Sequence, residues 1–300
     1  MKKILILGSE GFIGKHLVYY FKKTGWDVSG YDLQIVDSAG CSYHFIQKDD
    51  SAENLFSGNN FNVCINAAGY GSIPFSIADP VADFAANSYD TIIFLEGIRT
   101  FNPTCKYLHI SSAAVYGNPP NLPIKESGQL KPLSPYGWHK LISEEICREY
   151  HSLYGLNIII TRPFSVYGPG LKKQLFWDLY QKSLLPDREI ELWGTGNESR
   201  DFIYIDDFVR AFGILINHCV DSFSVFNIAS GVETTIKEVS ENFFRLLCPN
   251  KNIYFNNRIR IGDPHNWRGD ISAIKALNYN PEINIDQGIE QLIRWLKSLN

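Results

Sequence analysis

The chain has 300 residues, of which 45% are hydrophobic and 20% are charged, as is ordinary for a globular protein. This composition excludes a disordered or collagen-like chain, and the length corresponds to about two domains of roughly 150 residues each. The formal net charge of −4 provides no basic field for nucleic acid or anionic lipid. Because no apolar run reaches the ~18 residues of a membrane span, and none forms a signal-peptide core, we expect a cytoplasmic protein without nucleic-acid or membrane partners.

The first half of the chain alternates short apolar runs with longer segments of helical spacing. The predicted strands are 3–7, 27–31, 44–46, 62–66, 106–110 and 157–161, and the predicted helices are 12–23, 81–99 and 136–154. Strands that alternate with helices in this way predict an α/β fold with a doubly wound parallel sheet, covered by helices on both faces.

The second half has a looser pattern, with predicted helices at 172–184, 206–217, 236–247 and 286–299 and strands at 202–205 and 225–228. We expect a first domain of residues 1–165 and a smaller C-terminal α/β domain of residues 166–300. Segments near 200–230 are expected to pack back on the first domain. The chain has no low-complexity linker, so the two domains should pack closely, with the ligand in the cleft between them.

A glycine motif opens the first predicted helix directly after the first predicted strand. Gly8, Gly11 and Gly14 permit a tight turn and let a pyrophosphate approach the backbone and the helix N-terminus. A glycine-rich turn without a ligand is the alternative interpretation. Asp32 closes the second predicted strand, where a carboxylate can bind both ribose hydroxyls of an adenosine and repel a 2′-phosphate. The motif therefore predicts NAD in preference to NADP.

Other candidate residues carry weaker signals. Asp49 and Asp50 follow the third predicted strand, where the edge of an adenine could lie, although an exposed helix N-cap explains them equally well. The histidines and cysteines show no ligand spacing, so no metal is expected. Trp193 and Phe176 could line a nucleobase pocket, but core packing is the commoner role of large aromatic residues.

The strongest catalytic signal is the pair Tyr136 and Lys140, which share one face of a predicted helix because they are four residues apart. An ammonium beside a phenol is expected to lower the pKa of the phenol from about 10, so that the tyrosine can act as an acid or base near neutral pH. Ser111 and Ser112 close the fifth predicted strand, and the carboxyl ends of parallel strands face the ligand site. A serine there can bind the same substrate oxygen as the tyrosine.

Taken in order, these motifs resemble those of the extended short-chain dehydrogenase/reductase family, which includes nucleotide-sugar epimerases and dehydratases. The resemblance is nearly end to end. Besides the glycine motif and the tyrosine–lysine pair, it rests on Ala67-Ala68-Gly69, Asn87, Ser112, the run from Arg162-Pro163 to Gly170, Arg200-Asp201-Phe202, and Arg260-Ile261-Gly262-Asp263. It implies a Rossmann-like domain that binds NAD and a smaller C-terminal domain that binds a nucleoside-diphosphate sugar.

The resemblance also implies a role for individual residues. It makes Ser112, Tyr136 and Lys140 the catalytic residues. The implied cofactor contacts are Gly8, Gly11, Phe12, Ile13, Gly14, Asp32, Asp49, Asp50, Ala67, Ala68, Asn87, Tyr136, Lys140 and Pro163. The implied substrate contacts are Ser112, Tyr136, Ser165, Arg200 and Arg260. The two arginines would bind the diphosphate, since a guanidinium suits phosphate oxygens; surface salt bridges are the alternative. Ser165 is a departure, because the family often has asparagine there.

The residues after Ser112 narrow the reaction. They are acidic in the sugar 4,6-dehydratases and drive elimination of water, whereas this chain has Ala113 and Ala114. The predicted function is therefore an NAD-dependent nucleotide-sugar epimerase, acting at C4 through a transient 4-keto intermediate. The alternative is an NAD(P)H-dependent 4-ketoreductase of a nucleotide-linked 4-keto-6-deoxy sugar. A non-catalytic dinucleotide-binding protein on the same fold is the third hypothesis.

The resemblance further implies a homodimer. The predicted helices 81–99 and 136–154 would pair with their symmetry mates as a four-helix bundle. Apolar residues such as Phe84, Ile92, Leu95 and Ile146 are expected on more than one face of these helices, which calls for a second packing partner.

Overall fold

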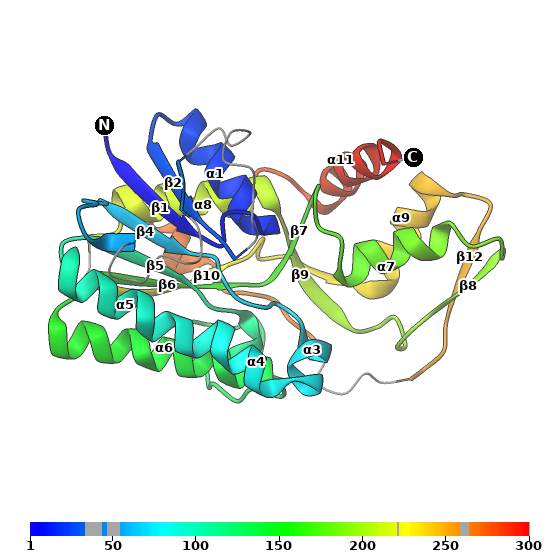
Figure 1. The fold of residues 1–300 in the computed structure, drawn as a ribbon. Helices are drawn as coiled ribbons and strands as arrows, with labels where there is room; N and C mark the ends of the chain where they lie inside the picture. Colours follow the sequence, from blue (N-terminus) through cyan, green and yellow to red (C-terminus); the bar gives the residue numbers. More distant parts are fainter. Residues whose placement is uncertain (34–43, 47–54, 221, 259–263, 300) are drawn as a thin grey trace.

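The computed structural model describes residues 1–33, 44–46, 55–220, 222–258 and 264–299. Within these residues a seven-stranded sheet forms the centre of the molecule, in the order β10-β6-β5-β4-β1-β2-β3 (Figure 1). Its strands are β1 (Lys3–Leu7), β2 (Asp27–Tyr31), β3 (His44–Ile46), β4 (Val63–Asn66), β5 (Lys106–Ile110), β6 (Ile158–Pro163) and β10 (Phe223–Ile228). Every neighbouring pair runs parallel. The predicted α/β fold with a parallel sheet is confirmed.

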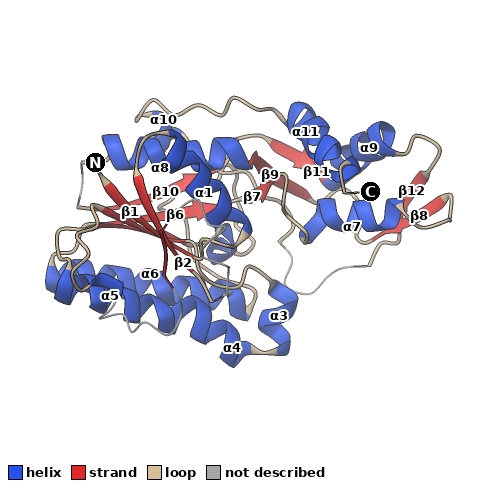
Figure 2. Cartoon of the chain, turned by 45° about the horizontal axis from the view of Figure 1, so that its top comes forward, coloured by secondary structure: helices blue, strands red, loops and turns tan. Residues whose placement is uncertain are grey.

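Helices cover both faces of this sheet (Figure 2). The helices α1 (Phe12–Lys23) and α8 (Ile205–His218) pack on one face, and α5 (Asp90–Phe101) and α6 (Pro135–Tyr154) lie side by side on the other. Along β1, Ile4 and Ile6 join the core under α1, whereas Leu5 and Leu7 join the core under α5. This two-sided burial explains why the central strands are continuous apolar runs.

The predicted helix 81–99 is divided into three parts. It comprises α4 (Pro80–Phe84), a π-helical segment (Ala85–Tyr89) and α5, and it follows the short helix α3 (Ile73–Ala78). Helical periodicity predicts the whole segment but not the wider π-helical turn. Such turns occur frequently at functional sites, and this one carries Asn87.

After β6 the chain leaves the central sheet. The strand β7 (Ser165–Tyr167) pairs with β9 (Ser199–Tyr204), which pairs with β11 (Glu233–Thr235), while β8 (Glu189–Leu192) pairs with β12 (Asn252–Phe255). The helices α7 (Gln174–Ser183), α9 (Ile236–Leu247) and α11 (Ile285–Lys297) pack around these strands, and α10 (Ser272–Lys275) packs on β10. The sequence prediction missed β7, β8, β11, β12, α3 and α10. Among the helices described, none is long and apolar enough to cross a membrane.

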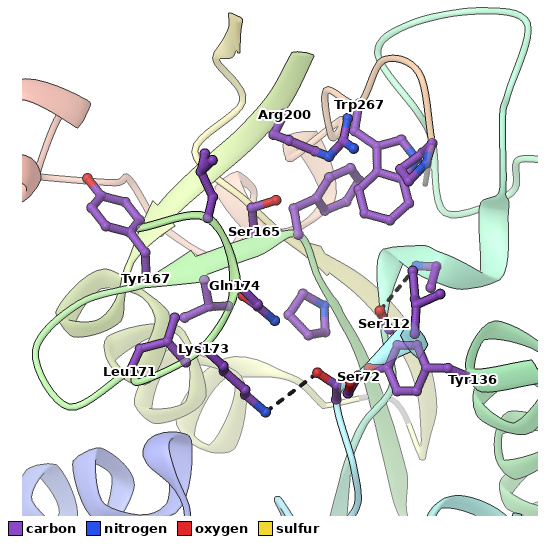
Figure 3. A pocket seen from close by; sticks show the side chains of 18 of the residues that line it. Ser72, Ser112, Tyr136, Ser165, Tyr167, Leu171, Lys173, Gln174, Arg200 and Trp267 are labelled. Carbon is purple, nitrogen blue, oxygen red and sulfur yellow. Dashed lines mark hydrogen bonds between the residues drawn. The ribbon is translucent and has the colours of Figure 1, made fainter. Parts of the chain in front are cut away.

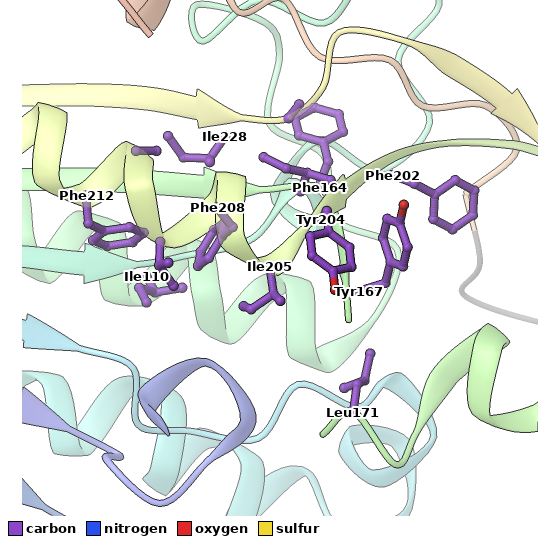
Figure 4. Close-up of a cluster of buried hydrophobic side chains, with 14 of the residues drawn as sticks. Ile110, Phe164, Tyr167, Leu171, Phe202, Tyr204, Ile205, Phe208, Phe212 and Ile228 are labelled. Carbon is purple, nitrogen blue, oxygen red and sulfur yellow. The ribbon is translucent and has the colours of Figure 1, made fainter. Parts of the chain in front are cut away.

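A buried aromatic cluster joins this second region to the central sheet (Figure 4). Tyr167 on β7 stacks on Phe176 of α7, with ring centroids 4.7 Å apart, and packs edge-on against Tyr204 at 5.5 Å. Ile110 and Ile228, at the ends of β5 and β10, belong to the same cluster. The walls on either side of the cleft therefore share one core, which fixes their relative position.

A tight contact within the glycine motif generates the first prediction. A Cβ atom on Gly14 would lie 2.0 Å from the carbonyl oxygen of Gly8. The substitution Gly14→Ala must push α1 away from the β1–α1 turn, and overpacking of this kind costs about 1–3 kcal/mol. We expect urea unfolding to show that loss in the free energy of unfolding. Tyr19→Ala, on the same helix with its side chain 69% exposed, is the control. Equal stability of the two variants would contradict the prediction.

Candidate active site

A cavity of about 1440 Å³ extends from the β1–α1 turn to the second region. It lies at the carboxyl ends of the parallel strands. In the sheet order, β1 and β4 are neighbours: β2 and β3 follow on one side of β1, and β5 and β6 follow on the other side of β4. Ligands of open parallel sheets bind at such a switch point in the strand order.

Most of the predicted site residues line this cavity. They are Gly11, Phe12, Ile13, Ala67, Ala68, Asn87, Ser112, Tyr136, Lys140, Pro163, Ser165 and Arg200. Gly8, Gly14 and Asp32 do not line it: the two glycines shape the turn, and an Asp32 carboxylate oxygen accepts a hydrogen bond from the Glu10 N–H at 2.9 Å. Asp49, Asp50 and Arg260 lie outside the described residues.

The N-terminus of α1 is suited to bind a pyrophosphate. The N-cap is Gly11, which has no side chain that could cap the helix. The N–H groups of the first turn have no acceptor within the helix, and Phe12 and Ile13 line the cavity. These donors and the positive end of the helix dipole favour an anion. Gly8, with φ of 75°, makes the turn that exposes them.

Asn87 is a second feature that fits a dinucleotide. Its side chain is 1% exposed, and its Nδ2 donates to the Tyr70 carbonyl at 3.2 Å and to Asp83 Oδ1 at 3.1 Å. Its Oδ1 has no hydrogen-bond partner among the described residues. Buried polar atoms are almost always paired, so this acceptor calls for a donor from a bound molecule. With the bare N-terminus of α1, it makes the cavity fit NAD.

The predicted catalytic residues Ser112, Tyr136 and Lys140 all line the cavity, and Figure 3 shows Ser112 and Tyr136 near each other. The Ser134 side chain accepts from the Gly137 N–H at 3.2 Å and caps α6 just before Tyr136. Ser112 Oγ accepts from the Ala114 N–H at 3.1 Å and starts a short 3₁₀ helix, Ala113–Tyr116. Two helix starts therefore place the phenol and the serine hydroxyl together.

The electrostatics of this pair differ from the prediction. Burial raises the pKa of Tyr136, and its hydrogen bond with Ser112 opposes that rise only in part. The Lys140 ammonium donates to the Ile110 carbonyl at 2.9 Å. Burial lowers the pKa of Lys140 to about 8, although the Asp83 carboxylate opposes this shift. The prediction that Lys140 lowers the pKa of Tyr136 is wrong for this structure. The ammonium donates to a backbone carbonyl, and burial is the largest influence on the pKa of the phenol.

Asp83 is a site residue that the sequence analysis missed. It is fully buried, and its Oδ2 lies 2.6 Å from His139 Nδ1, while its Oδ1 accepts from Asn87. Asp83 thus ties the π-helical wall of the cavity to α6, next to Tyr136 and Lys140. Its position four residues before Asn87 places both on one helix face, which is the signal that could have identified it.

Ser111 has a structural role in the packing of α6 against the sheet. Its hydroxyl donates to Glu144 Oε1 at 2.5 Å, and Glu144 is paired with Arg162 through an Nη2–Oε2 contact of 2.6 Å. All three residues are buried. Of the two serines that follow β5, Ser112 is the one that lies near Tyr136 and opposes the rise of its pKa.

Aromatic and cationic side chains surround the far end of the cavity (Figure 3). The Arg200 guanidinium lies over the Trp267 ring, 5.7 Å from its centroid, and donates to the His265 carbonyl at 3.2 Å. Trp193 is 42% exposed, with the Arg258 guanidinium over its ring at 5.9 Å, so the core-packing interpretation is wrong for it. Phe176, in contrast, is buried in the core.

The sequence analysis also missed several cavity residues from the second region, namely Lys173, Gln174, Arg258, His265 and Trp267. The carboxylate of Asp201 holds the segment with His265 and Trp267 in place. It accepts hydrogen bonds from the N–H groups of Gly269 and Gly231, both at 3.0 Å. The aspartate next to Arg200 in the sequence is therefore an anchor for the wall of the site.

Comparison with known proteins agrees with this geometry. Residues 4–229 match the model of the NAD dependent epimerase/dehydratase family. The chain belongs to this family. It is 30% identical to a putative UDP-glucose 4-epimerase of Methanocaldococcus jannaschii, over 99% of both chains. It is 27% identical to a UDP-glucuronate 4-epimerase of Thermodesulfobacterium geofontis, over 98% of this chain and 95% of that protein.

A solved structure shows the same overall fold. The UDP-glucuronic acid 4-epimerase of Bacillus cereus, in complex with UDP-glucuronic acid and NAD, superimposes with a TM-score of 0.89. The match covers 99% of this chain and 100% of that chain, with 27% sequence identity. The predicted resemblance to nucleotide-sugar epimerases and the dependence on NAD are confirmed.

The lowered pKa of Lys140 generates a prediction about pH. Because burial lowers this pKa to about 8, the ammonium is charged below that pH and loses its proton above it. We expect kcat/KM to fall as the pH rises through about 8. Lys140→Arg keeps its charge over the whole pH range. Its kcat/KM should therefore not fall above pH 8, even if its turnover is lower than that of the wild type. A wild-type profile that stays flat well above pH 8 would contradict the assignment.

Proposed function

We propose that the protein is an NAD-dependent 4-epimerase of a UDP-sugar. The convergence of Ser112 and Tyr136 on a cavity that also contains the uncapped N-terminus of α1 carries this proposal. It is supported by the relatives named above, which are 4-epimerases of UDP-linked sugars.

The residues divide the chemistry between them. Bound NAD supplies the hydride acceptor and donor at its nicotinamide. Tyr136 exchanges the proton of the sugar C4 hydroxyl, and Ser112 hydrogen-bonds to the same oxygen, so that a C–H bond at C4 can break and re-form on the other face of the ring. Lys140, whose ammonium donates to the Ile110 carbonyl, would contact the cofactor ribose. Ala113 and Ala114 are buried and apolar, so they offer no acid or base for elimination of water.

We further propose that residues 1–165 bind NAD and that residues 166–300 bind the nucleotide sugar, with α8 and β10 returning to the first part. In this arrangement Gly8, Gly11 and Gly14 form the pyrophosphate turn and Asp32 binds the adenosine ribose. Arg200 binds the diphosphate, and Ser165 contacts the sugar nucleotide. We also propose a cytoplasmic location, which is supported by the five described cysteines, since all of them are free thiols.

The test of the function is direct assay of UDP-sugars. An epimerase interconverts two UDP-sugars with no net consumption of reduced cofactor, whereas a 4-ketoreductase consumes one reduced cofactor per product. Product analysis by NMR, alongside the absorbance of the reduced cofactor, separates the two. Stoichiometric oxidation of NADH or NADPH with a 4-keto sugar, without interconversion of any UDP-sugar, would reject the epimerase.

The acid–base role of Tyr136 gives a specific expectation. Tyr136→Phe removes the proton-exchanging group and should lower kcat by about 10²–10⁴-fold, the usual contribution of general acid–base catalysis. NAD affinity, measured by titration, should stay near that of the wild type. Tyr19→Phe, at an exposed position on α1, is the matched control. Turnover of Tyr136→Phe close to the wild-type rate would remove this mechanism.

We propose that the protein forms a homodimer through α4, α5 and α6. Of the apolar residues predicted for this surface, Phe84 is 40% exposed, but Leu95 is buried in the core and Ile92 and Ile146 pack against it. Different residues give the face its apolar character, namely Val81, Tyr89, Trp138, Ile142, Leu153 and Tyr154, all of them exposed. Exposed apolar residues gathered on neighbouring helices mark an interaction surface.

The dimer proposal is tested by a charge placed on this face. Ile142→Glu and Trp138→Glu should shift the protein to a monomer in light scattering at micromolar concentration, because an unpaired buried carboxylate is costly. Leu184→Glu, at an exposed apolar position at the end of α7, should leave the assembly unchanged. A monomeric wild type would refute the dimer.

A further inference from the structure

Lys173 is a cation in the cavity that the proposed chemistry does not use. It is the N-cap residue of α7, and its side chain reaches across the cavity toward α3 (Figure 3). A Cβ atom on Gly71 would lie 3.6 Å from Lys173 Nζ and 4.0 Å from Tyr136 Oη. These two distances set an upper limit on the separation of the Lys173 ammonium and the Tyr136 phenol oxygen, and both groups therefore border the same part of the cavity.

The local structure around Lys173 breaks three rules at once. An N-cap residue is normally Ser, Thr, Asp or Asn, whose side chain caps the helix, but Lys173 makes no such bond. A positive charge at a helix N-terminus also opposes the helix dipole. The next residue, Gln174, has a φ of 64°, a left-handed conformation that long side chains rarely adopt. Departures of this kind are retained where a site requires them.

The charge of Lys173 is not neutralised by the described part of the protein. Its one hydrogen bond there is to the Gly71 carbonyl, at 3.5 Å, which is long for such a bond. The two carboxylates that line the cavity are engaged elsewhere: Asp178 lies 3.0 Å from Lys182 Nζ, and Glu198 accepts from the N–H groups of the Thr195–Gly196 turn. Lys173 is exposed in the free protein, so water solvates its charge there. A neutral sugar that filled the cavity would displace part of this water without supplying a counter-ion.

We propose that the substrate sugar is anionic, a UDP-linked uronic acid whose carboxylate binds Lys173. This inference rests on the proposed 4-epimerase function, because that function places the C4 hydroxyl of the sugar at Tyr136 and so fixes how the sugar is oriented. In a uronic acid the carboxylate is carried by C5, the neighbour of C4. A phenol on the C4 oxygen and an ammonium on the carboxylate then lie on neighbouring atoms of the ring, a spacing that falls within the upper limit for Tyr136 and Lys173. The diphosphates have their own partners in the N-terminus of α1 and Arg200.

The experiment compares UDP-glucuronate with UDP-glucose on the NAD-loaded enzyme, by calorimetric Kd and by kcat/KM. The wild type should bind UDP-glucuronate more tightly. Lys173→Met should weaken UDP-glucuronate by about 10- to 100-fold, the value of a charge-assisted hydrogen bond, and leave UDP-glucose nearly unchanged. Lys173→Arg should retain most of the preference. Lys172→Met is the matched control, because Lys172 lies outside the cavity with its Nζ 6.0 Å over the Trp177 ring.

The two measurements separate the inference from the function on which it rests. Equal or tighter binding of UDP-glucose by the wild type, or an equal loss for both sugars in Lys173→Met, would overturn the anionic-sugar assignment. Selective binding of UDP-glucuronate that depends on Lys173, without any interconversion, would support the assignment and reject the epimerase. Interconversion of UDP-glucose with no effect of Lys173→Met would support the epimerase and reject the assignment.

Discussion

The buried ion pair between Glu144 and Arg162 is the contact on which the active site depends. It joins the middle of α6 to the end of β6 through an Nη2–Oε2 contact of 2.6 Å and an Nε–Oε1 hydrogen bond of 3.0 Å. Burial alone would lower the pKa of Arg162, but the bonds to Glu144 hold it above its usual value. Because α6 carries Tyr136 and Lys140, this pair sets how the helix lies against the strand ends. Loss of one partner would leave an uncompensated buried charge, which costs about 3–5 kcal/mol.

The same pair extends into the second region through a chain of buried hydrogen bonds. Arg162 Nη1 donates to Tyr116 Oη at 2.9 Å, and the Tyr116 hydroxyl donates to Asn227 Oδ1 at 2.7 Å. Asn227 Nδ2 then donates to the Asp270 carbonyl at 3.2 Å. Asp270 lies in the segment that Asp201 also anchors and that brings Trp267 to the cavity. One polar network thus connects α6, the helix that carries Tyr136 and Lys140, with the cavity wall around Trp267. The aromatic cluster around Tyr167 provides the apolar contact between the two regions.

The sequence contains enough information for the central sheet, because strands buried on both faces must be apolar runs and their covering helices must be amphipathic. It predicts Gly11, Ser112 and Tyr136 correctly as cavity residues, since each follows a strand end or a helix start that the pattern reveals. The short strands β7, β8, β11 and β12 escape prediction because three or four residues carry too little periodicity and their partners are distant in sequence.

Asp83 and Lys173 were not predicted as site residues because their importance depends on which residues they approach in space. The raised pKa of Tyr136 was not predicted because it is caused mainly by burial, which residue spacing does not reveal.

Local departures from the usual rules are concentrated at the cavity wall, and this distribution argues for function. Among the described residues with positive φ other than glycine, Asn257 and Asn278 belong to the type that tolerates this conformation, and Gln174, which lines the cavity, does not. The π-helical segment interrupts an otherwise regular helix at Asn87, which lines the cavity and whose Oδ1 is paired with none of the residues that the structure describes. A lysine occupies the N-cap of α7, where it opposes the helix dipole. Each feature costs stability in the free protein. A ligand that donates to Asn87 Oδ1 would pair this buried oxygen, and a negative charge beside Lys173 would offset the unfavourable charge at the N-terminus of α7.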